Sequence, residues 1–256
     1  MTDNTGKFVW YEYMGANIAA AAEFYRNVVG WEIAETGMAG FPYQIASVAG
    51  SGVAGMMTTP DDAKAMGVPS CWTAYIWVPD VDAGVEKLKA SGGHVMKGPM
   101  DIPNVGRCAI VADNQGAPFA MFRDLGGDPP PPPAPGTPGL VGWRELHAAN
   151  GEAALAFYVS QFGWKEDRQH DMGPMGIYRI FDVGGQQGGI MTKMAQTPGP
   201  CWLYYFNVEA ADAAGARVTA GGGKVMNGPH QVPGGLWVTQ AVDREGAMFG
   251  LVSAIK

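Results

Sequence analysis

The chain has few charged residues, few cysteines and no long hydrophobic run. Charged residues make up only 16% of its 256 residues, and acidic ones outnumber basic ones, so the net charge is −7 at pH 7. A negative net charge argues against a nucleic-acid partner, which needs a positively charged surface. No apolar run reaches the roughly 18 residues that a membrane-spanning helix requires, so we expect no membrane partner either.

The beginning of the chain and its cysteines indicate the compartment. Residues Met1 to Lys7 lack the basic and then apolar order that is typical of a secretion signal. The three cysteines, Cys71, Cys108 and Cys201, are an odd number in a long chain, which is typical of reduced thiols. We therefore expect a cytoplasmic protein.

Glycine, proline and aromatic residues are abundant. The 8 tryptophans, 9 tyrosines and 10 phenylalanines can fill a folded core. Five successive prolines, Pro129 to Pro133, lie in a Gly- and Pro-rich stretch, and such a stretch is extended and semi-rigid. The sequence therefore predicts two domains, 1–126 and 140–256, joined by a linker over 127–139.

The two predicted domains repeat each other. Trp10-Tyr-Glu12 returns as Trp143-Arg-Glu145, at an offset of 133 residues. Further pairs follow at offsets of 133 and then 130: Asn17 and Asn150, Tyr25 and Tyr158, Trp31 and Trp164, Trp72 and Trp202, Asp113 and Asp243. So many aligned aromatic and polar residues indicate a duplicated domain.

Each half also contains a repeat of its own. Residues 8–14 have the pattern of a strand, Asn17 is a suitable N-cap for a helix over 18–29, and three short strands follow. The same order returns with a strand near 72–78, a helix over 81–90 and three more strands. The sequence predicts an α+β fold with two βαβββ units in each half.

This order of elements, together with three motifs, resembles the vicinal-oxygen-chelate superfamily of glyoxalases, bleomycin-resistance proteins and extradiol dioxygenases. The motifs are Phe24-Tyr25 followed by Gly30-Trp31, then Val78-Pro-Asp-Val-Asp-Ala83, and Asp113-Asn-Gln-Gly-Ala-Pro-Phe119. The resemblance implies that the two βαβββ units of each half form a curved eight-stranded cup whose floor holds the site.

The resemblance also implies a divalent metal held by His, Gln or Glu on the first, fifth and eighth strands. These positions fall on Trp10, Thr73 and Ala120 in the first half, and on Trp143, Leu203 and Gly250 in the second. Neither set offers a carboxylate, imidazole or thiolate, which are the usual ligands of such metals. We therefore predict no metal at these positions and no other cofactor.

Glu12 and Glu145 are the candidate catalytic residues. They lie two residues after Trp10 and Trp143, and alternate residues of a strand share a face, so both glutamates are expected to point into the cups. Burial among apolar side chains raises the pKa of a carboxyl group, which could then abstract a proton next to a carbonyl. The alternative is that each glutamate holds the sheet together, by bonding a backbone amide or Arg144.

Other polar and aromatic side chains are candidates for binding a ligand. Glu145 and His147 share a strand face and could supply two metal ligands, with His170 or His230 as a third, which keeps a divalent metal open as an alternative. Arg107 is expected to pair with an anionic ligand, where the second half has Trp237. The predicted ligand-binding residues are Trp10, Thr73, Tyr75, Trp77, Arg107, Trp143, His147, Tyr205 and Trp237.

A glycine motif that resembles a dinucleotide-binding loop has a simpler interpretation. Gly50-Ser-Gly-Val-Ala-Gly55 fits the pattern Gly-x-Gly-x-x-Gly, but Pro60 follows too soon for the helix that the motif requires. We interpret these glycines as the tight turn of a hairpin and expect no nicotinamide cofactor.

Three functions remain open. The first, which we prefer, is a glyoxalase-like enzyme or enzyme-like protein that lacks the usual metal ligands and acts on an aldehyde or hydroxylated metabolite. The second is a non-catalytic binding protein of the bleomycin-resistance type, which holds a flat apolar compound. The third is a metal-dependent lyase or dioxygenase. In each case the partner is a small molecule, and we expect a monomer or homodimer.

Overall fold

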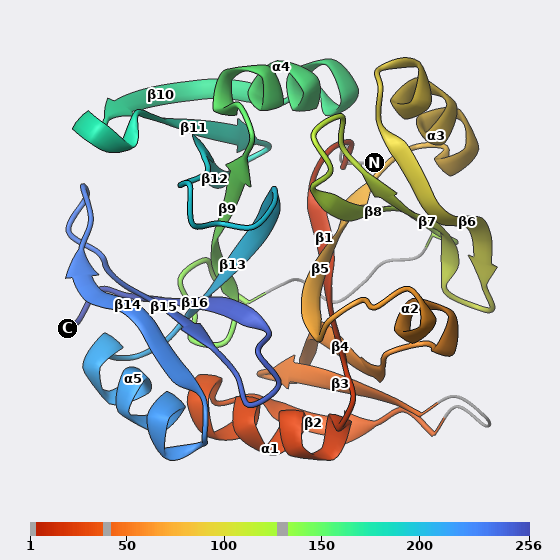
Figure 1. Ribbon diagram of the computed structural model, residues 1–256. Coiled ribbons are helices and arrows are strands. Elements are labelled where there is room, and N and C mark those ends of the chain that lie inside the picture. The colour runs from red at the N-terminus through yellow and green to blue at the C-terminus, as the bar shows by residue number, and fades with distance from the viewer. Residues whose placement is uncertain (1–3, 38–41, 127–132) are drawn as a thin grey trace. The chain divides into compact units, whose positions relative to one another are not determined.

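The computed structural model describes residues 4–37, 42–126 and 133–256, so residues 127–132 of the predicted linker lie outside it. It contains two eight-stranded sheets, with strand orders β2-β3-β4-β1-β5-β8-β7-β6 and β10-β11-β12-β9-β13-β16-β15-β14. Each sheet combines two βαβββ modules, and few helices accompany them (Figure 1). The predicted α+β class and tandem repeat are confirmed.

The elements follow the predicted order in four modules. Module 1 comprises β1 (Phe8–Gly15), α1 (Ile18–Val29), β2 (Glu32–Glu35), β3 (Tyr43–Val48) and β4 (Ser51–Thr58), followed by a short α2 (Asp61–Ala65). Module 2 comprises β5 (Cys71–Trp77), α3 (Val81–Ala90), β6 (His94–Ile102), β7 (Gly106–Ala112) and β8 (Pro118–Asp124). Module 3 comprises β9 (Val141–Ala148), α4 (Gly151–Phe162), β10 (Lys165–Asp171), a 3-10 turn (Gly173–Met175), β11 (Ile177–Val183) and β12 (Gln186–Thr192). Module 4 comprises β13 (Cys201–Asn207), α5 (Ala211–Ala220), β14 (Lys224–Gln231), β15 (Trp237–Val242) and β16 (Met248–Ser253).

The contacts divide the chain into two compact units that differ from the two sequence repeats. The first unit contains Met1–Trp10, Thr73–Pro129 and Arg144–Leu203, and so combines modules 2 and 3. The second contains Tyr11–Trp72, Pro130–Trp143 and Tyr204–Lys256, and so combines modules 1 and 4. The predicted boundaries follow the repeat along the sequence, whereas these units follow contacts in space.

The first helix of each repeat is delimited by its own end residues. Asn17 accepts a hydrogen bond from the Ala20 N–H at 3.1 Å, and Gly30 ends α1 with a φ of 89°. Asn150 caps α4 in the same way. Such caps satisfy backbone groups that a helix leaves unbonded at its ends.

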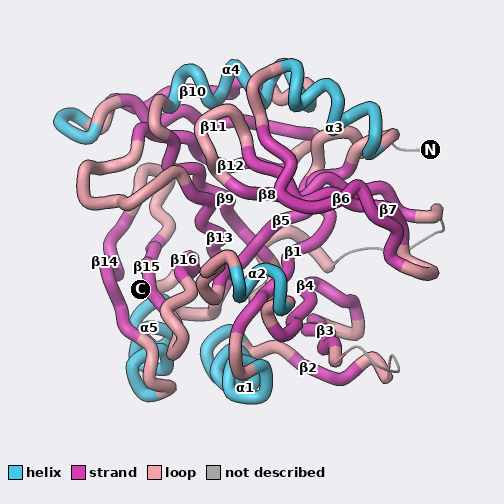
Figure 2. The backbone as a smooth tube through the Cα atoms, turned by 45° about the vertical axis from the view of Figure 1, so that its right-hand side comes forward, coloured by secondary structure: helices cyan, strands magenta, loops and turns pink. Residues whose placement is uncertain are grey.

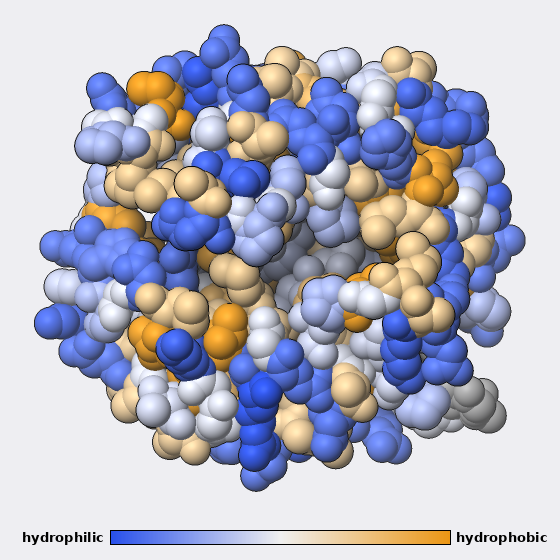
Figure 3. Space-filling view, viewed as in Figure 1, coloured by the Kyte–Doolittle hydropathy of each residue, from blue (hydrophilic) through white to orange (hydrophobic). Residues whose placement is uncertain are grey.

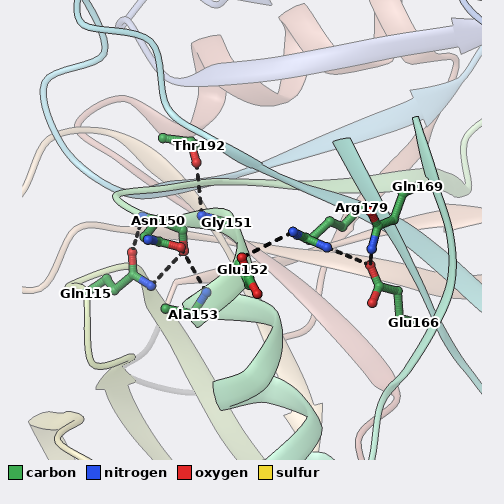
Figure 4. Close-up of polar contacts among 9 residues, drawn as sticks. All are labelled: Gln115, Asn150, Gly151, Glu152, Ala153, Glu166, Gln169, Arg179 and Thr192. Atoms are coloured by element: carbon green, nitrogen blue, oxygen red, sulfur yellow. Dashed lines mark hydrogen bonds and ion pairs between the residues drawn. The ribbon is translucent and has the colours of Figure 1, made fainter. Parts of the chain in front are cut away.

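The start of α4 is also tied to two neighbouring elements (Figure 4). The side chain of Gln115, in the turn between β7 and β8, bonds both the N–H and the C=O of Asn150, at 2.7 and 3.0 Å. The N–H of Gly151 donates to the hydroxyl of Thr192 on β12 at 3.1 Å. The Gln115 bonds join module 2 to module 3 within the first unit, and the Gly151 bond ties α4 to β12 of its own module.

A buried tyrosine joins the two modules of each unit. In the second unit the Tyr25 hydroxyl accepts from Trp72 Nε1 at 2.8 Å and donates to Asp243 Oδ2 at 3.1 Å. In the first unit, Tyr158 makes the corresponding bonds with Trp202 and Asp113, at 3.2 and 3.1 Å. The repeated tyrosine, tryptophan and aspartate thus meet in the core.

Helices of partner modules lie side by side within a unit. In the second unit α1 and α5 are neighbours in both views (Figures 1 and 2), and Arg217 of α5 donates to the Val28 carbonyl of α1 at 2.9 Å. In the first unit Lys87 of α3 donates to the carbonyls of Ser160 and Gln161 near the end of α4, at 2.6 and 2.9 Å. These bonds place cations on carbonyls at a helix C-terminus, where they interact favourably with the helix dipole.

One face of the molecule and the described helices bear on contact with a membrane. The face seen in Figure 3 is mostly hydrophilic, and its hydrophobic residues occur in small groups. Among the described helices, none combines the length and the apolar composition that crossing a membrane requires.

Glu245 is the counterpart of Gln115 in the second unit and carries a charge. Its carboxylate accepts hydrogen bonds from the backbone N–H groups of Ala16 and Asn17, at 2.8 and 2.7 Å, and from the Ser70 hydroxyl at 2.7 Å. Burial acts to raise the pKa of Glu245, but these bonds outweigh it and hold the pKa below its usual value. The carboxylate also lies at the N-terminus of α1, where negative charge is favourable.

We expect Glu245→Gln to flatten the acid dependence of stability. A carboxyl whose pKa is lowered on folding stabilises the protein above the unfolded pKa of about 4.3, and this contribution is lost as the pH falls through the folded pKa. As the pH is lowered from about 5 to 3, the unfolding temperature should therefore fall less steeply in Glu245→Gln than in wild type. Glu209→Gln, an exposed glutamate of the same unit, is the matched control. Equal slopes for Glu245→Gln and wild type would contradict this assignment.

Candidate functional site

Each of the two predicted catalytic glutamates is buried and bonded to a tyrosine. Glu12 on β1 is 5% exposed, and its Oε2 accepts a hydrogen bond from the Tyr43 hydroxyl of β3 at 3.1 Å. Glu145 on β9 is 8% exposed, and its Oε2 accepts from the Tyr178 hydroxyl of β11 at 2.8 Å. The first pair lies within the second unit and the other pair within the first unit.

A glycine on the intervening strand makes room for each pair. Gly55 of β4 is opposite Glu12, and Gly189 of β12 is opposite Glu145. A Cβ atom at Gly55 would overlap the Tyr43 hydroxyl, and one at Gly189 would overlap the Tyr178 ring and hydroxyl. Each tyrosine can therefore cross the neighbouring strand only because that strand has no side chain there.

This glycine function differs from the hairpin turn that the sequence suggested. Gly50, with a φ of 78°, does lie in the turn between β3 and β4, whereas Gly55 lies within β4. The two tyrosines were not among the predicted site residues. The signal that could have found them is a tyrosine early in the third strand of both copies, followed by a glycine within the fourth.

The second copy adds an imidazole to its pair. Nε2 of His147 lies 2.8 Å from Oε1 of Glu145, so both carboxylate oxygens are bonded. The first copy has Met14 at this position, opposite Met57 as His147 is opposite Met191. Nδ1 of His147 is buried and has no hydrogen-bond partner among the described residues. An unsatisfied buried group of this kind costs about 1–3 kcal/mol.

The positions at which the sequence resemblance places the family's metal ligands carry no ordinary ligand side chain. Trp, Thr, Ala, Leu and Gly occupy them, and none of these supplies a carboxylate, imidazole or thiolate. In the described part of the chain, no three His, Cys, Asp or Glu side chains are grouped closely enough to hold an ion. Glu145 and His147 lie close together, but they bond each other. His170 on β10 is paired with Tyr178 on the neighbouring strand β11.

Two predicted ligand-binding residues of the first unit belong to an apolar cluster. Trp10 and Tyr75 pack together there, and Tyr75 is opposite Ala120 in the sheet. Several members of this cluster are only half-buried and so present apolar surface: Trp10, Met100, Ile102, Ile110 and Phe122. Thr73 is buried nearby on β5.

The remaining two candidates of the first unit have protein partners. Trp77 donates to Asp124 Oδ2 at 2.7 Å. The Arg107 guanidinium bonds Asp82 at 2.6 and 2.9 Å and Asp101 at 2.8 Å, and these bonds raise its pKa. The anion that Arg107 pairs with in this structure is thus its own protein's carboxylates.

The predicted residues of the second unit have a more polar setting. The Tyr205 hydroxyl accepts a hydrogen bond from Gln240 Nε2 at 2.7 Å, whereas the residue aligned with Gln240 in the first copy is Ile110. Lys256 lies over the ring of Trp237, 5.3 Å from its centroid. Trp143 is half-buried on β9.

We expect Gly189→Ala to displace Tyr178 and to lower the free energy of unfolding by about 1–3 kcal/mol, the usual cost of overpacking. In a Tyr178→Ala background the same substitution should cost much less, because the overlap is gone. Denaturant unfolding of the four proteins in this double-mutant cycle measures the coupling. Gly199→Ala, which meets open space, is the control. A cost for Gly189→Ala that is the same in both backgrounds would refute the steric role.

The chain matches known proteins over nearly its whole length. The family model described as Glyoxalase/Bleomycin resistance protein/Dioxygenase superfamily matches residues 7–121 and 142–251. A Mycobacterium tuberculosis protein named "Putative glyoxylase CFP32" is 30% identical over 249 residues, covering 95% of this chain and 93% of its own. Anthracycline biosynthesis protein DnrV of Streptomyces peucetius is 31% identical over 267 residues, covering 96% and 93%.

Solved structures share the fold at low sequence identity. The Mn(II)-bound glyoxalase from Novosphingobium aromaticivorans is 16% identical with a TM-score of 0.66, and the match covers 100% of this chain and 84% of that one. A variant of homoprotocatechuate 2,3-dioxygenase from B. fuscum is 11% identical with a TM-score of 0.68, covering 97% and 71%. With a family model matched in both halves, this chain belongs to the Glyoxalase/Bleomycin resistance protein/Dioxygenase superfamily.

Proposed function

We propose that this protein is a glyoxalase-like enzyme that works without the family's metal and acts on an aldehyde or hydroxylated metabolite. Glu12 and Glu145 are the central residues of its two proton-transfer sites. The observation that carries the proposal is the buried carboxylate–tyrosine pair, which occurs once in each copy with a glycine left open for it.

The chemistry of a buried carboxylate suits proton transfer next to a carbonyl. Removing a carboxylate from water favours its protonated form, which makes it a stronger base. The carboxylate takes the proton from the carbon beside the carbonyl, and the electrons of that C–H bond form an enediolate. The proton then returns to the former carbonyl carbon, and the hydrogen of the neighbouring hydroxyl moves to the former carbonyl oxygen, so that the hydroxyl-bearing carbon becomes the new carbonyl. This isomerisation consumes no oxidant or reductant. Tyr43 and Tyr178 orient the two carboxylates.

The donor chemistry of the family's metal positions supports a route without metal. Trp10, Thr73 and Ala120, like Trp143, Leu203 and Gly250, have no side chain suited to a divalent ion. We therefore assign proton transfer to the protein's own residues.

A second candidate is a non-catalytic protein that binds a flat apolar compound. The half-buried apolar cluster around Trp10 and Tyr75 favours it, because aromatic and aliphatic side chains suit a planar ligand. The similarity to a protein named for anthracycline biosynthesis is also consistent with a polycyclic ligand.

Replacing both glutamates tests the proposal. We expect Glu12→Gln together with Glu145→Gln to lower kcat by about 10²–10⁴-fold, the usual contribution of a general base, while the unfolding temperature changes little. Turnover is measured with hemithioacetals of methylglyoxal and with a panel of hydroxyaldehydes. Glu32→Gln, an exposed glutamate, should keep wild-type activity.

Other outcomes discriminate among the functions. Activity that is lost on treatment with a chelator and restored by Mn²⁺ or Fe²⁺ would overturn the metal-independent route. Tight binding of 1,4-dihydroxyanthraquinone without turnover of any aldehyde would favour the binding protein.

A further inference from the structure

We infer that His147 is a second catalytic residue of the second copy, held in place by the Glu145–Tyr178 pair, and that its Nδ1 atom receives a proton from a hydroxyl group of the ligand while Glu145 remains the base for the carbon-bound proton. The inference rests on the proposed function and deepens it for one of the two sites. It also makes the two copies chemically different.

The bonding around Glu145 fixes which nitrogen of His147 faces away from the carboxylate. Glu145 accepts from the Tyr178 hydroxyl through Oε2 at 2.8 Å, and its Oε1 lies 2.8 Å from His147 Nε2. An ionised carboxylate can only accept hydrogen bonds, so Nε2 carries the hydrogen. When the imidazole is neutral, its lone pair is therefore on Nδ1. A carboxylate that orients an imidazole in this way is the general arrangement of a base held by a third group.

Nδ1 of His147 is a hydrogen-bond acceptor for which this arrangement provides no donor. It is buried and has no hydrogen-bond partner among the described residues, although buried polar atoms are nearly always bonded. A ligand that brings an O–H group would satisfy it. The O–H bond breaks, the proton moves to Nδ1 while the electrons remain on the ligand oxygen, and the imidazolium pairs with the Glu145 carboxylate. The proton returns to the ligand when the product forms.

The first copy shows that the strand itself does not require a histidine. Met14 occupies the same position on β1, beside a glutamate with the same tyrosine partner and the same open glycine. Its thioether cannot exchange a proton. The histidine is therefore an addition to a site whose packing works without it, which favours a chemical role over a structural one.

The tautomer of His147 can be measured directly. The chain has 4 histidines, so side-chain ¹⁵N NMR of the full-length protein resolves few signals, and loss of one signal set in His147→Gln assigns it. We expect hydrogen on Nε2 and an acceptor-type Nδ1, whose signal shifts when 1,4-dihydroxyanthraquinone is added. Hydrogen on Nδ1 in the ligand-free protein, or an Nδ1 signal unchanged by a probe that binds, would overturn the inference.

Exchanging the residues of the two copies provides the second test. In a Glu12→Gln background, which leaves only the second copy to turn over, His147→Met should lower kcat at least about 10-fold with a smaller change in KM, since a general base contributes about 10²–10⁴-fold. Free imidazole added to His147→Ala should restore part of the lost turnover, which a purely structural role would not allow. In the Glu12→Gln background, an unchanged kcat on His147→Met together with activity lost on Glu145→Gln would refute the role of His147 but leave the proposed function standing. Full activity in the double glutamine variant would refute the proposed function itself, and the NMR measurement would still decide the tautomer.

Discussion

The fold depends on a hydrogen-bonded tyrosine in the core of each compact unit. Tyr25 and Tyr158 each accept a hydrogen bond from a tryptophan of the following module in the same sequence repeat. Each also donates to an aspartate of the other sequence repeat, in the module that shares its compact unit. The other oxygen of each aspartate accepts two backbone N–H groups of the turn that follows it, at 2.8 and 2.9 Å. Burial and the nearby Asp243 raise the pKa of Tyr25, so its hydroxyl keeps its hydrogen and the network stays intact. The repeated motifs therefore explain why module 1 is grouped with module 4, and module 2 with module 3.

Local elements could be predicted from the sequence, and long-range grouping could not. Helices α1 and α3 have the predicted bounds because residues at their ends delimit them. The short helix α2 has no side-chain cap and no apolar stripe, so nothing in the sequence marked it. The composition of the compact units depends on bonds between residues far apart in the sequence: Tyr25 and Asp243 are 218 positions apart, and Tyr158 and Asp113 are 45 apart. The periodicity of apolar residues carries no information about such pairs.

For the candidate site, the inward direction of the two glutamates could be predicted, and their tyrosine partners could not. Strand alternation was enough to select Glu12 and Glu145, because the face of a side chain follows from its position in the strand. Their tyrosine partners come from a strand two places away in the sheet, and sheet register decided which residue met which glutamate. The partners of Arg107 were not predictable either, because Asp82 and Asp101 come within reach of it only in the folded chain.

The open glycine beside each tyrosine limits the order in which the two copies can change. While Tyr43 or Tyr178 is present, any side chain at Gly55 or Gly189 collides with it, so the glycine is held in place by its neighbour rather than by its own backbone. Loss of Tyr178 would remove the nearest obstacle at Gly189, whereas at Gly55 an added Cβ atom would still lie 2.7 Å from Oε1 of Glu12. In a related sequence, a larger residue at the position of Gly189 would therefore indicate that the tyrosine of that copy was lost before the glycine was replaced.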